Sequence, residues 1–266
     1  MTIDTIEISS GTMDYLKFGQ GEEKLVIIPG LSVRSVLRFA EAIAEAYELL
    51  ASEFTIYLLD RKSNPPKGYT LNEMASDTAE AIRALGIQRA SVLGASQGGM
   101  IALTIAITQP DLVDKLVVCS TSARMEGAAL DVLATWIELA KAEDAEGLYL
   151  AFGKAIYPSN VFSSMRSALL EEAAKTTSEE LRRFVILAES ARDFNVLNDL
   201  DKIACPVFAI GSKDDGVFGA EPTLQIAERL GNRPDFALHL YDGFGHAAYD
   251  LAPDFKERVL RFLKSR

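Results

Sequence analysis

The chain has 266 residues, of which 48% are hydrophobic, and a formal net charge of −11 at pH 7. A chain of this length can bury a sizeable core, and α/β proteins of this size are commonly one domain, so we expect one core with an insertion. Because nucleic acids and anionic membranes bind basic surfaces, the negative net charge indicates that neither is a partner of this protein.

The first half of the chain predicts alternating strands and helices. Residues 3–8 and 12–18 alternate around the turn Ser10-Gly11, which indicates an antiparallel hairpin at a sheet edge. Four apolar runs follow, each typical of a buried strand: residues 25–28, 54–59, 91–95 and 116–119. Helix-spaced apolar residues separate these runs, so their order predicts right-handed crossovers and a mostly parallel sheet with helices on both faces.

From about residue 124 to residue 201 the strand signals disappear. Four amphipathic segments stand in their place, which predicts a helical insertion projecting from the ends of the strands. Strand signals return at 206–210 and 236–240. The sequence therefore predicts an α/β fold with a mostly parallel eight-stranded sheet, a core made of residues 1–123 and 202–266, and a helical cap at 124–201.

Cellular context is indicated by what the sequence lacks. Cys119 and Cys205 do not make a disulfide framework, so we expect buried thiols in a reduced, cytoplasmic protein. The N-terminal segment has no basic-then-apolar pattern of a signal peptide, and no apolar run reaches membrane-spanning length. The expected partner is a small-molecule substrate, with no nucleic acid, membrane, metal or other cofactor; the sequence does not indicate the oligomeric state.

The stretch Gly94-Ala95-Ser96-Gln97-Gly98 lies between a predicted buried strand and an apolar helix. In that context G-x-S-x-G predicts a nucleophile elbow, in which a serine sits on a sharp turn with its hydroxyl projecting outward. Glycines two residues on either side permit strand and helix to pack closely. The backbone N–H of Gln97 stands at the helix start, where it can point at a developing oxyanion. Taken alone, the motif also fits a small-residue turn that serves only packing.

A serine nucleophile needs a base, and the base needs an acid to orient it. Of the two histidines, His239 lies inside the last predicted strand and is expected to be structural, whereas His246 follows that strand in a glycine-rich loop and is the candidate base. The acid should end the preceding strand. Asp214 and Asp215 both qualify; we favour Asp214 and expect the other to be partly solvated.

These candidates follow different strands, and ligands of an open parallel sheet bind beyond the carboxyl ends of its strands. Ser96, Asp214 and His246 all fall at such ends, as does the loop Gly30-Leu31. We therefore expect the backbone N–H of Leu31 to be the second donor of an oxyanion hole. Two separated histidines do not favour a metal site.

Taken together, these segments resemble the α/β-hydrolase family over essentially the whole chain. The resemblance rests on the sheet order, the G-x-S-x-G run, the strand ends at Asp214 and His246, and the helices between them. It implies a nucleophile, a base, an acid and an oxyanion hole, which correspond in this chain to Ser96, His246, Asp214, and the N–H groups of Leu31 and Gln97. The chain is similar to small capped members such as carboxylesterases and enol-lactonases.

The chain departs from the family pattern in two loops. Pro29-Gly30 stands where many members have His-Gly, a histidine that often braces the oxyanion loop. Residues 61–66 stand where many relatives have a glycine-rich turn. Neither departure removes a group that does chemistry.

The function we expect is cleavage of a small, fairly apolar ester or lactone through an acyl-enzyme intermediate. Aromatic residues of the predicted cap are candidates for the pocket wall: Trp136, Tyr149, Phe152, Tyr157 and Phe162. A ligand sensor on the same fold, with little or no catalysis and a protein partner, is the alternative from another class. An aminopeptidase or a carbon–carbon bond hydrolase are alternatives within the enzymes.

Overall fold

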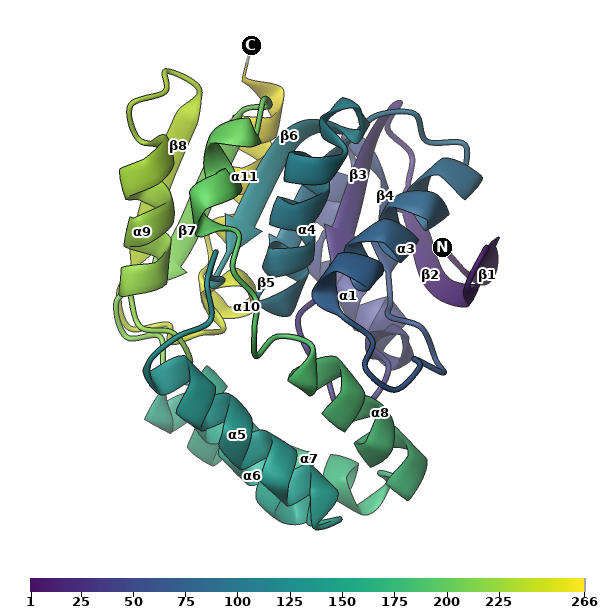
Figure 1. The fold of residues 1–266 in the computed structure, drawn as a ribbon, viewed down its shortest axis with the longest axis vertical. Helices are drawn as coiled ribbons and strands as arrows, with labels where there is room; N and C mark the ends of the chain where they lie inside the picture. The colour runs from purple at the N-terminus through teal and green to yellow at the C-terminus, as the bar shows by residue number, and fades with distance from the viewer. Residues whose placement is uncertain (266) are drawn as a thin grey trace.

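A computed structural model describes residues 1–265 and has a single eight-stranded sheet at its centre, in the order β1-β2-β4-β3-β5-β6-β7-β8 (Figure 1). The hairpin β1–β2 pairs antiparallel with β4, and the other neighbouring strands run parallel. The predicted mostly parallel sheet is therefore present. The strands are β1 (Thr2–Ile8), β2 (Gly11–Gly19), β3 (Glu23–Ile28), β4 (Phe54–Leu59), β5 (Ala90–Ala95), β6 (Val113–Cys119), β7 (Val207–Ser212) and β8 (Phe236–Tyr241).

Helices cover both faces of the sheet because successive strand residues point to opposite sides. In β3, Val26 and Ile28 join one buried cluster, which includes the inner faces of α3 (Leu71–Ala84), α4 (Gln97–Thr108) and α9 (Glu221–Leu230). Leu25 and Ile27 join the other, which includes residues of α1 (Ala40–Ala46), α2 (Glu48–Ala51) and α11 (Phe255–Lys264). No helix within residues 1–265 combines the length and apolar character needed to cross a membrane.

The helical insertion consists of α5 (Ala128–Lys141), α6 (Ala145–Ile156), α7 (Ser159–Ala174) and α8 (Ser178–Glu189), and it lies between β6 and β7 in the chain. Figure 1 shows these four helices grouped beyond one end of the sheet. The chain enters and leaves the insertion through one neck, where Met125 N donates to Phe194 O and Val196 N donates to Ala123 O. The four amphipathic segments expected here thus form helices; the domain limits at residues 124 and 201 stay a prediction.

Both cysteines are free and buried. Burial raises the pKa of each thiol, to about 11 for Cys205 and further for Cys119. Neither thiol is therefore an activated nucleophile in this structure.

A buried charge network joins the β1–β2 turn, the loop after β4 and α3. Lys62 Nζ lies 2.6 Å from Asp77 Oδ2, and both side chains are at least nine-tenths buried. Ser10 Oγ donates to Asp77 Oδ1 at 2.7 Å, and the Tyr69 hydroxyl donates to the same carboxylate. Burial pushes the pKa of Asp77 up, but the hydrogen bonds from Lys62, Ser10 and Tyr69 outweigh it and hold the pKa below its usual value.

Asp77→Asn is expected to lower the free energy of unfolding by about 3 kcal/mol, because it leaves the buried Lys62 ammonium without its counter-charge. Urea denaturation at pH 7 measures the change. The matched control is Asp114→Asn, which breaks an ion pair with Arg89 whose side chains are 50% and 59% exposed, and should cost no more than about 1 kcal/mol. Equal, small losses in both variants would contradict a structural role for the network.

Candidate active site

Ser96 sits on a strained turn between β5 and α4. Its backbone angles are φ 52° and ψ −123°, a left-handed conformation that is costly for a residue with a side chain. Two contacts hold the turn: Ser96 N donates to Cys119 O at 2.9 Å, and Thr121 Oγ1 donates to Ser96 O at 2.6 Å. The strain is thus imposed by the surrounding sheet, as expected for a nucleophile elbow.

The glycines beside Ser96 allow three backbone segments to meet. A Cβ on Gly98 would lie 2.0 Å from Ile28 O and 2.4 Å from Pro29 O. A Cβ on Gly94 would lie 2.4 Å from Gly98 O. Contacts this short exclude any side chain at either position, so the start of α4 packs directly against the loop that follows β3.

That loop and the start of α4 place the two predicted oxyanion donors next to Ser96. A Cβ on Gly30 would lie only 3.2 Å from Ser96 Cβ, and Gln97 is the first residue of α4. Within residues 1–265, neither Leu31 N nor Gln97 N donates a hydrogen bond. Free N–H groups beside a nucleophile are what stabilisation of an oxyanion requires.

Arg61 braces the loop after β3. Its side chain is buried, and Nη2 donates to Pro29 O at 2.5 Å. Burial lowers the pKa of Arg61 to about 10. The guanidinium thus contacts the loop at the residue where many relatives have the bracing histidine. Sequence reasoning missed this role, although the position of Arg61 directly after β4 placed it at the same sheet edge.

His246 is held by Asp215. Nδ1 lies 2.8 Å from Asp215 Oδ2 and 3.0 Å from Oδ1, and each side chain is 2% exposed. Asp215 Oδ1 also accepts hydrogen bonds from Val217 N and Phe218 N, at 2.8 and 2.9 Å. With Nδ1 engaged by the carboxylate, Nε2 is the ring nitrogen that can take a proton.

The expectation that Asp214 orients His246 is wrong in this structure. Asp214 is exposed and accepts hydrogen bonds from Ser212 Oγ at 2.6 Å, Gly243 N at 3.0 Å and Gly245 N at 3.1 Å. Burial raises its pKa less than these hydrogen bonds lower it, so the pKa lies below its usual value. Asp214 therefore shapes the loop that carries His246, and its neighbour Asp215 reaches the ring.

The second histidine, His239, lies within the edge strand β8, where its ring centroid is 4.4 Å from that of Tyr241. It forms no hydrogen bond with Asp214 or Asp215 within residues 1–265. Its placement in the strand agrees with the structural role expected for it.

The elbow and the histidine loop both lie at the carboxyl ends of the parallel strands. Backbone hydrogen bonds connect the ends of β5 to β8 in series: Ser96 N to Cys119 O, Ser120 N to Ile210 O, and Lys213 N to Tyr241 O. Ser96 Oγ and His246 form no hydrogen bond in the part of the chain described here. Bonds of this kind often tighten only when a substrate binds.

A cavity of about 520 Å³ adjoins this edge, between the sheet and the helical insertion. Gly30 and Leu31 line it, as do Ala95, which precedes Ser96, and Tyr249, which follows His246 by three residues. The residues of its wall are mostly apolar, and a few of them are charged. A cavity of this size and character suits a small organic ligand.

The family model described as "alpha/beta hydrolase fold" matches residues 25–215, which span the elbow, the insertion and Asp215. The chain belongs to the α/β-hydrolase family. A protein named putative carbamate hydrolase RutD, from Agrobacterium fabrum, is 29% identical over 229 residues, which are 81% of this chain and 85% of that protein.

Solved structures share the α/β-hydrolase fold over nearly the whole chain. MGS-M2, an α/β-hydrolase enzyme from a Medee basin deep-sea metagenome library, matches with a TM-score of 0.86 at 22% identity, over 99% of this chain and 98% of that one. The enol-lactonase from Burkholderia xenovorans LB400 matches with a TM-score of 0.82 at 18% identity, over 98% of this chain and 100% of that one. At these identities the likeness shows the fold alone.

In this α/β-hydrolase, three of the five predicted wall residues lie on the cavity. They are Tyr149, Phe152 and Tyr157, all from α6 or its C-terminal end. Trp136 is buried in the insertion, with its ring centroid 4.4 Å from that of Phe152, and Phe162 packs beside Gly153. Neither Trp136 nor Phe162 lines the cavity, because each faces a neighbouring helix of the insertion.

The Gln97 side chain links the elbow of the α/β-hydrolase core to the insertion. Its Nε2 donates to Leu187 O at 2.6 Å, near the end of α8. The residue whose backbone forms half of the predicted oxyanion hole therefore also fixes the insertion above it.

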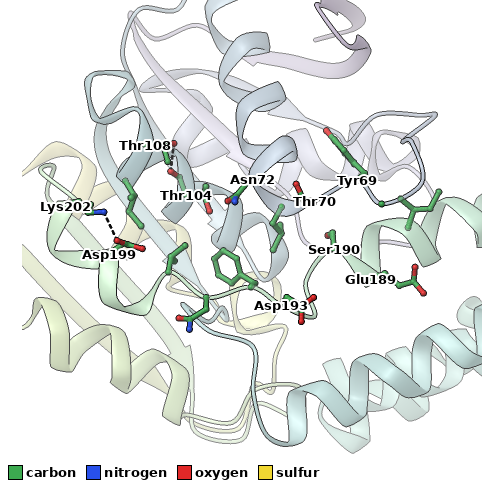
Figure 2. Close-up of a pocket in the computed structure, with 17 residues that line it drawn as sticks. Tyr69, Thr70, Asn72, Thr104, Thr108, Glu189, Ser190, Asp193, Asp199 and Lys202 are labelled. Atoms are coloured by element: carbon green, nitrogen blue, oxygen red, sulfur yellow. Dashed lines mark hydrogen bonds and ion pairs between the residues drawn. The ribbon is translucent and has the colours of Figure 1, made fainter.

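A second cavity, of about 600 Å³, lies on the α3–α4 side of the α/β-hydrolase core. Figure 2 shows Thr104 and Thr108 of α4 on its wall, with Asp199 paired to Lys202 at its edge. The chain leaving the insertion, residues 189–196, closes its other side. The first cavity is bordered by Gly30, Leu31 and Ala95, which flank the elbow, whereas no residue of the elbow, the oxyanion loop or the histidine loop lines the second. The candidate chemistry therefore belongs to the first cavity.

Proposed function

We propose that this α/β-hydrolase is a serine hydrolase that cleaves a small, fairly apolar ester or lactone through an acyl-enzyme intermediate. The observation that carries the proposal is the buried His246–Asp215 pair at the sheet edge where Ser96 occupies a strained turn. A serine, an imidazole and a carboxylate at one end of a sheet are the three side chains of a catalytic triad.

The proposed reaction assigns one task to each group. His246 Nε2 takes the proton of Ser96 Oγ as the oxygen attacks the substrate carbonyl carbon, and Asp215 stabilises the imidazolium that forms. The N–H groups of Leu31 and Gln97 bind the oxyanion. His246 then gives the proton to the leaving oxygen, and the acyl group stays on Ser96. A water molecule, activated in the same way, releases the acid and restores the serine.

The cavity supports a substrate with a substantial apolar part. Tyr149, Phe152 and Tyr157 form its wall on the side of the insertion, and Leu31 reaches it from the oxyanion loop. Burying an apolar group against such a wall favours binding by about 25 cal/mol per Å² of apolar area, before the costs of ordering the ligand. The relative named a putative carbamate hydrolase adds carbamates to the classes that the test must include.

A panel of matched esters, lactones, thioesters, amides and carbamates tests the proposal. We expect turnover to be highest for the ester or lactone of each matched set and to be absent when Ser96 is replaced by alanine. Higher turnover of carbamates or amides would overturn the proposed substrate class but keep the serine mechanism. Binding of panel members without any turnover would instead support the ligand-sensor alternative.

A further inference from the structure

Asp250 presents a carboxyl group to the cavity beside the proposed active site. It lies on the short helix α10 (Ala248–Leu251), four residues after His246, and it is on the cavity wall next to Tyr249. The side chain is exposed, yet it makes no hydrogen bond or ion pair within residues 1–265. An open carboxyl with no partner on the wall of a largely apolar cavity is available to a ligand that enters the cavity.

Three tyrosines share the cavity with this carboxyl. Tyr47 from the end of α1, Tyr157 from the end of α6 and Tyr249 from α10 all line it. Each also has a pKa raised by burial first and then by the negative charge of Asp250, to about 12 for Tyr157. A carboxylate that shares a cavity with aromatic rings can attract organic cations, which gain from both the charge and the rings.

The positive groups nearby leave the charge of Asp250 incompletely compensated. Lys256 Nζ donates to Tyr249 O at 2.9 Å and lies over the Tyr47 ring, 5.2 Å from its centroid, and forms no ion pair with Asp250. The apolar surroundings partly desolvate the Asp250 carboxyl, although it stays open to the cavity, and raise its pKa to about 6 even though Lys256 and His246 act to lower it.

The two arginines on the cavity wall are already paired. Arg34 contacts Glu172 and Glu180, and Arg38 contacts Glu172. Of the carboxyls on the wall, Glu172 is thus already paired, whereas Asp250 and the exposed Glu171 of α7 form no ion pair within residues 1–265. Asp250 is the one on the segment that follows His246.

We propose that Asp250 binds a protonated amine or quaternary ammonium group of the substrate, so that this hydrolase prefers small apolar acyl compounds that carry one cation. The inference rests on the proposed function for the identity of the reacting centre. Because His246 and Asp250 belong to one short segment, the cation would lie close to the carbonyl that Ser96 attacks.

A pair of isosteric esters tests the cation site: acetylcholine, which carries a quaternary ammonium group, and 3,3-dimethylbutyl acetate, which has carbon in place of nitrogen. Dissociation constants are measured on Ser96→Ala protein, so binding is separated from turnover. We expect the cationic ester to bind about tenfold more tightly, which corresponds to about 1.4 kcal/mol. Asp250→Asn in the same background should reduce the preference to about threefold or less.

Two further variants keep the test decisive. Asp250→Glu retains the charge and should retain the preference. Asp242→Asn removes an exposed carboxylate four residues before His246, which is paired with Lys213, and should leave the preference unchanged. An absent preference in Ser96→Ala protein, or one that survives Asp250→Asn, would overturn the cation site. If the cation preference were found but the parent protein turned over no member of the ester and lactone panel, the cation site would stand and the proposed hydrolase function would be refuted.

The preference should also depend on pH. The Asp250 carboxyl is charged above its pKa of about 6, so the preference is present at pH 8 and lost as the pH falls through 6. Lys256, His246 and the three tyrosines face the same region, and they are unchanged in Asp250→Asn. Subtracting the pH profile of that variant therefore isolates the carboxyl, and identical profiles would contradict the inference.

Discussion

Replacement of Ser96 by alanine is expected to lower kcat for the best substrate by about 10⁴-fold or more, because it removes the oxygen that attacks the substrate carbonyl in the proposed mechanism. The protein should stay folded, since the backbone of the turn is held by Cys119 O and Thr121 Oγ1 and not by the Ser96 hydroxyl. Steady-state kinetics and a thermal denaturation curve, recorded on the same preparation, measure both effects.

The matched control for this change is Ser163→Ala. The Ser163 hydroxyl is exposed on α7 and donates to Ser159 O within its own helix. Its removal should leave kcat within about twofold of the parent, as expected for a surface substitution away from the site. If Ser96→Ala instead retained activity within tenfold of the parent, Ser96 would not be the nucleophile.

The two neighbouring aspartates should respond very differently to the same substitution. Asp215→Asn removes the charge that holds His246 Nδ1, and kcat is expected to fall by about 10⁴-fold while the binding of substrate changes little. Asp214→Asn keeps one acceptor for Gly243 N and Gly245 N, so we expect a loss of about tenfold or less.

Asp214→Asn is thus a control for Asp215→Asn one residue away. Measuring kcat and KM for both variants shows which of the two carboxylates orients His246. Equal and mild losses would mean that neither carboxylate supports the base. A larger loss in Asp214→Asn would return the acid to the position that the sequence favoured.

The sheet and the nucleophile could be predicted because their signals are local. Continuous apolar runs mark strands that are buried on both faces, and each of them forms a strand in the structure. The glycine spacing around Ser96 reports a close approach, and in the structure Gly98 meets the carbonyl oxygens of Ile28 and Pro29. With two histidines in the chain, the order of the segments already favoured His246.

The acid could not be chosen from the sequence because the choice depends on the path of one turn. Asp214 and Asp215 are adjacent, and both follow the same strand end. Which carboxylate reaches His246 is decided by the bend after β7, where Val217 N and Phe218 N hold the Asp215 side chain. Composition and periodicity contain no information about that bend.

The cavity wall could be predicted only in part, for a similar reason: Tyr149, Phe152 and Tyr157 line the cavity, and Trp136 and Phe162 do not. Apolar stripes show that each helix of the insertion buries one face, but they do not show which element that face packs against. Trp136 therefore resembled a wall residue, whereas in the structure it packs on Phe152, which does line the cavity. Asp250 and Arg61 were not singled out because charged residues in loops and short helices are usually solvated; only their surroundings in three dimensions distinguish them.

Labelling with a fluorophosphonate, followed by peptide mapping, tests the nucleophile most directly. The reagent modifies a serine only when a base activates it and an oxyanion hole receives the phosphoryl oxygen. We expect a single adduct on the peptide that carries Ser96, no adduct in Ser96→Ala, and much slower labelling in Asp215→Asn than in Asp214→Asn. An adduct on a different residue, or no adduct in a protein that hydrolyses esters, would contradict Ser96 as the activated nucleophile.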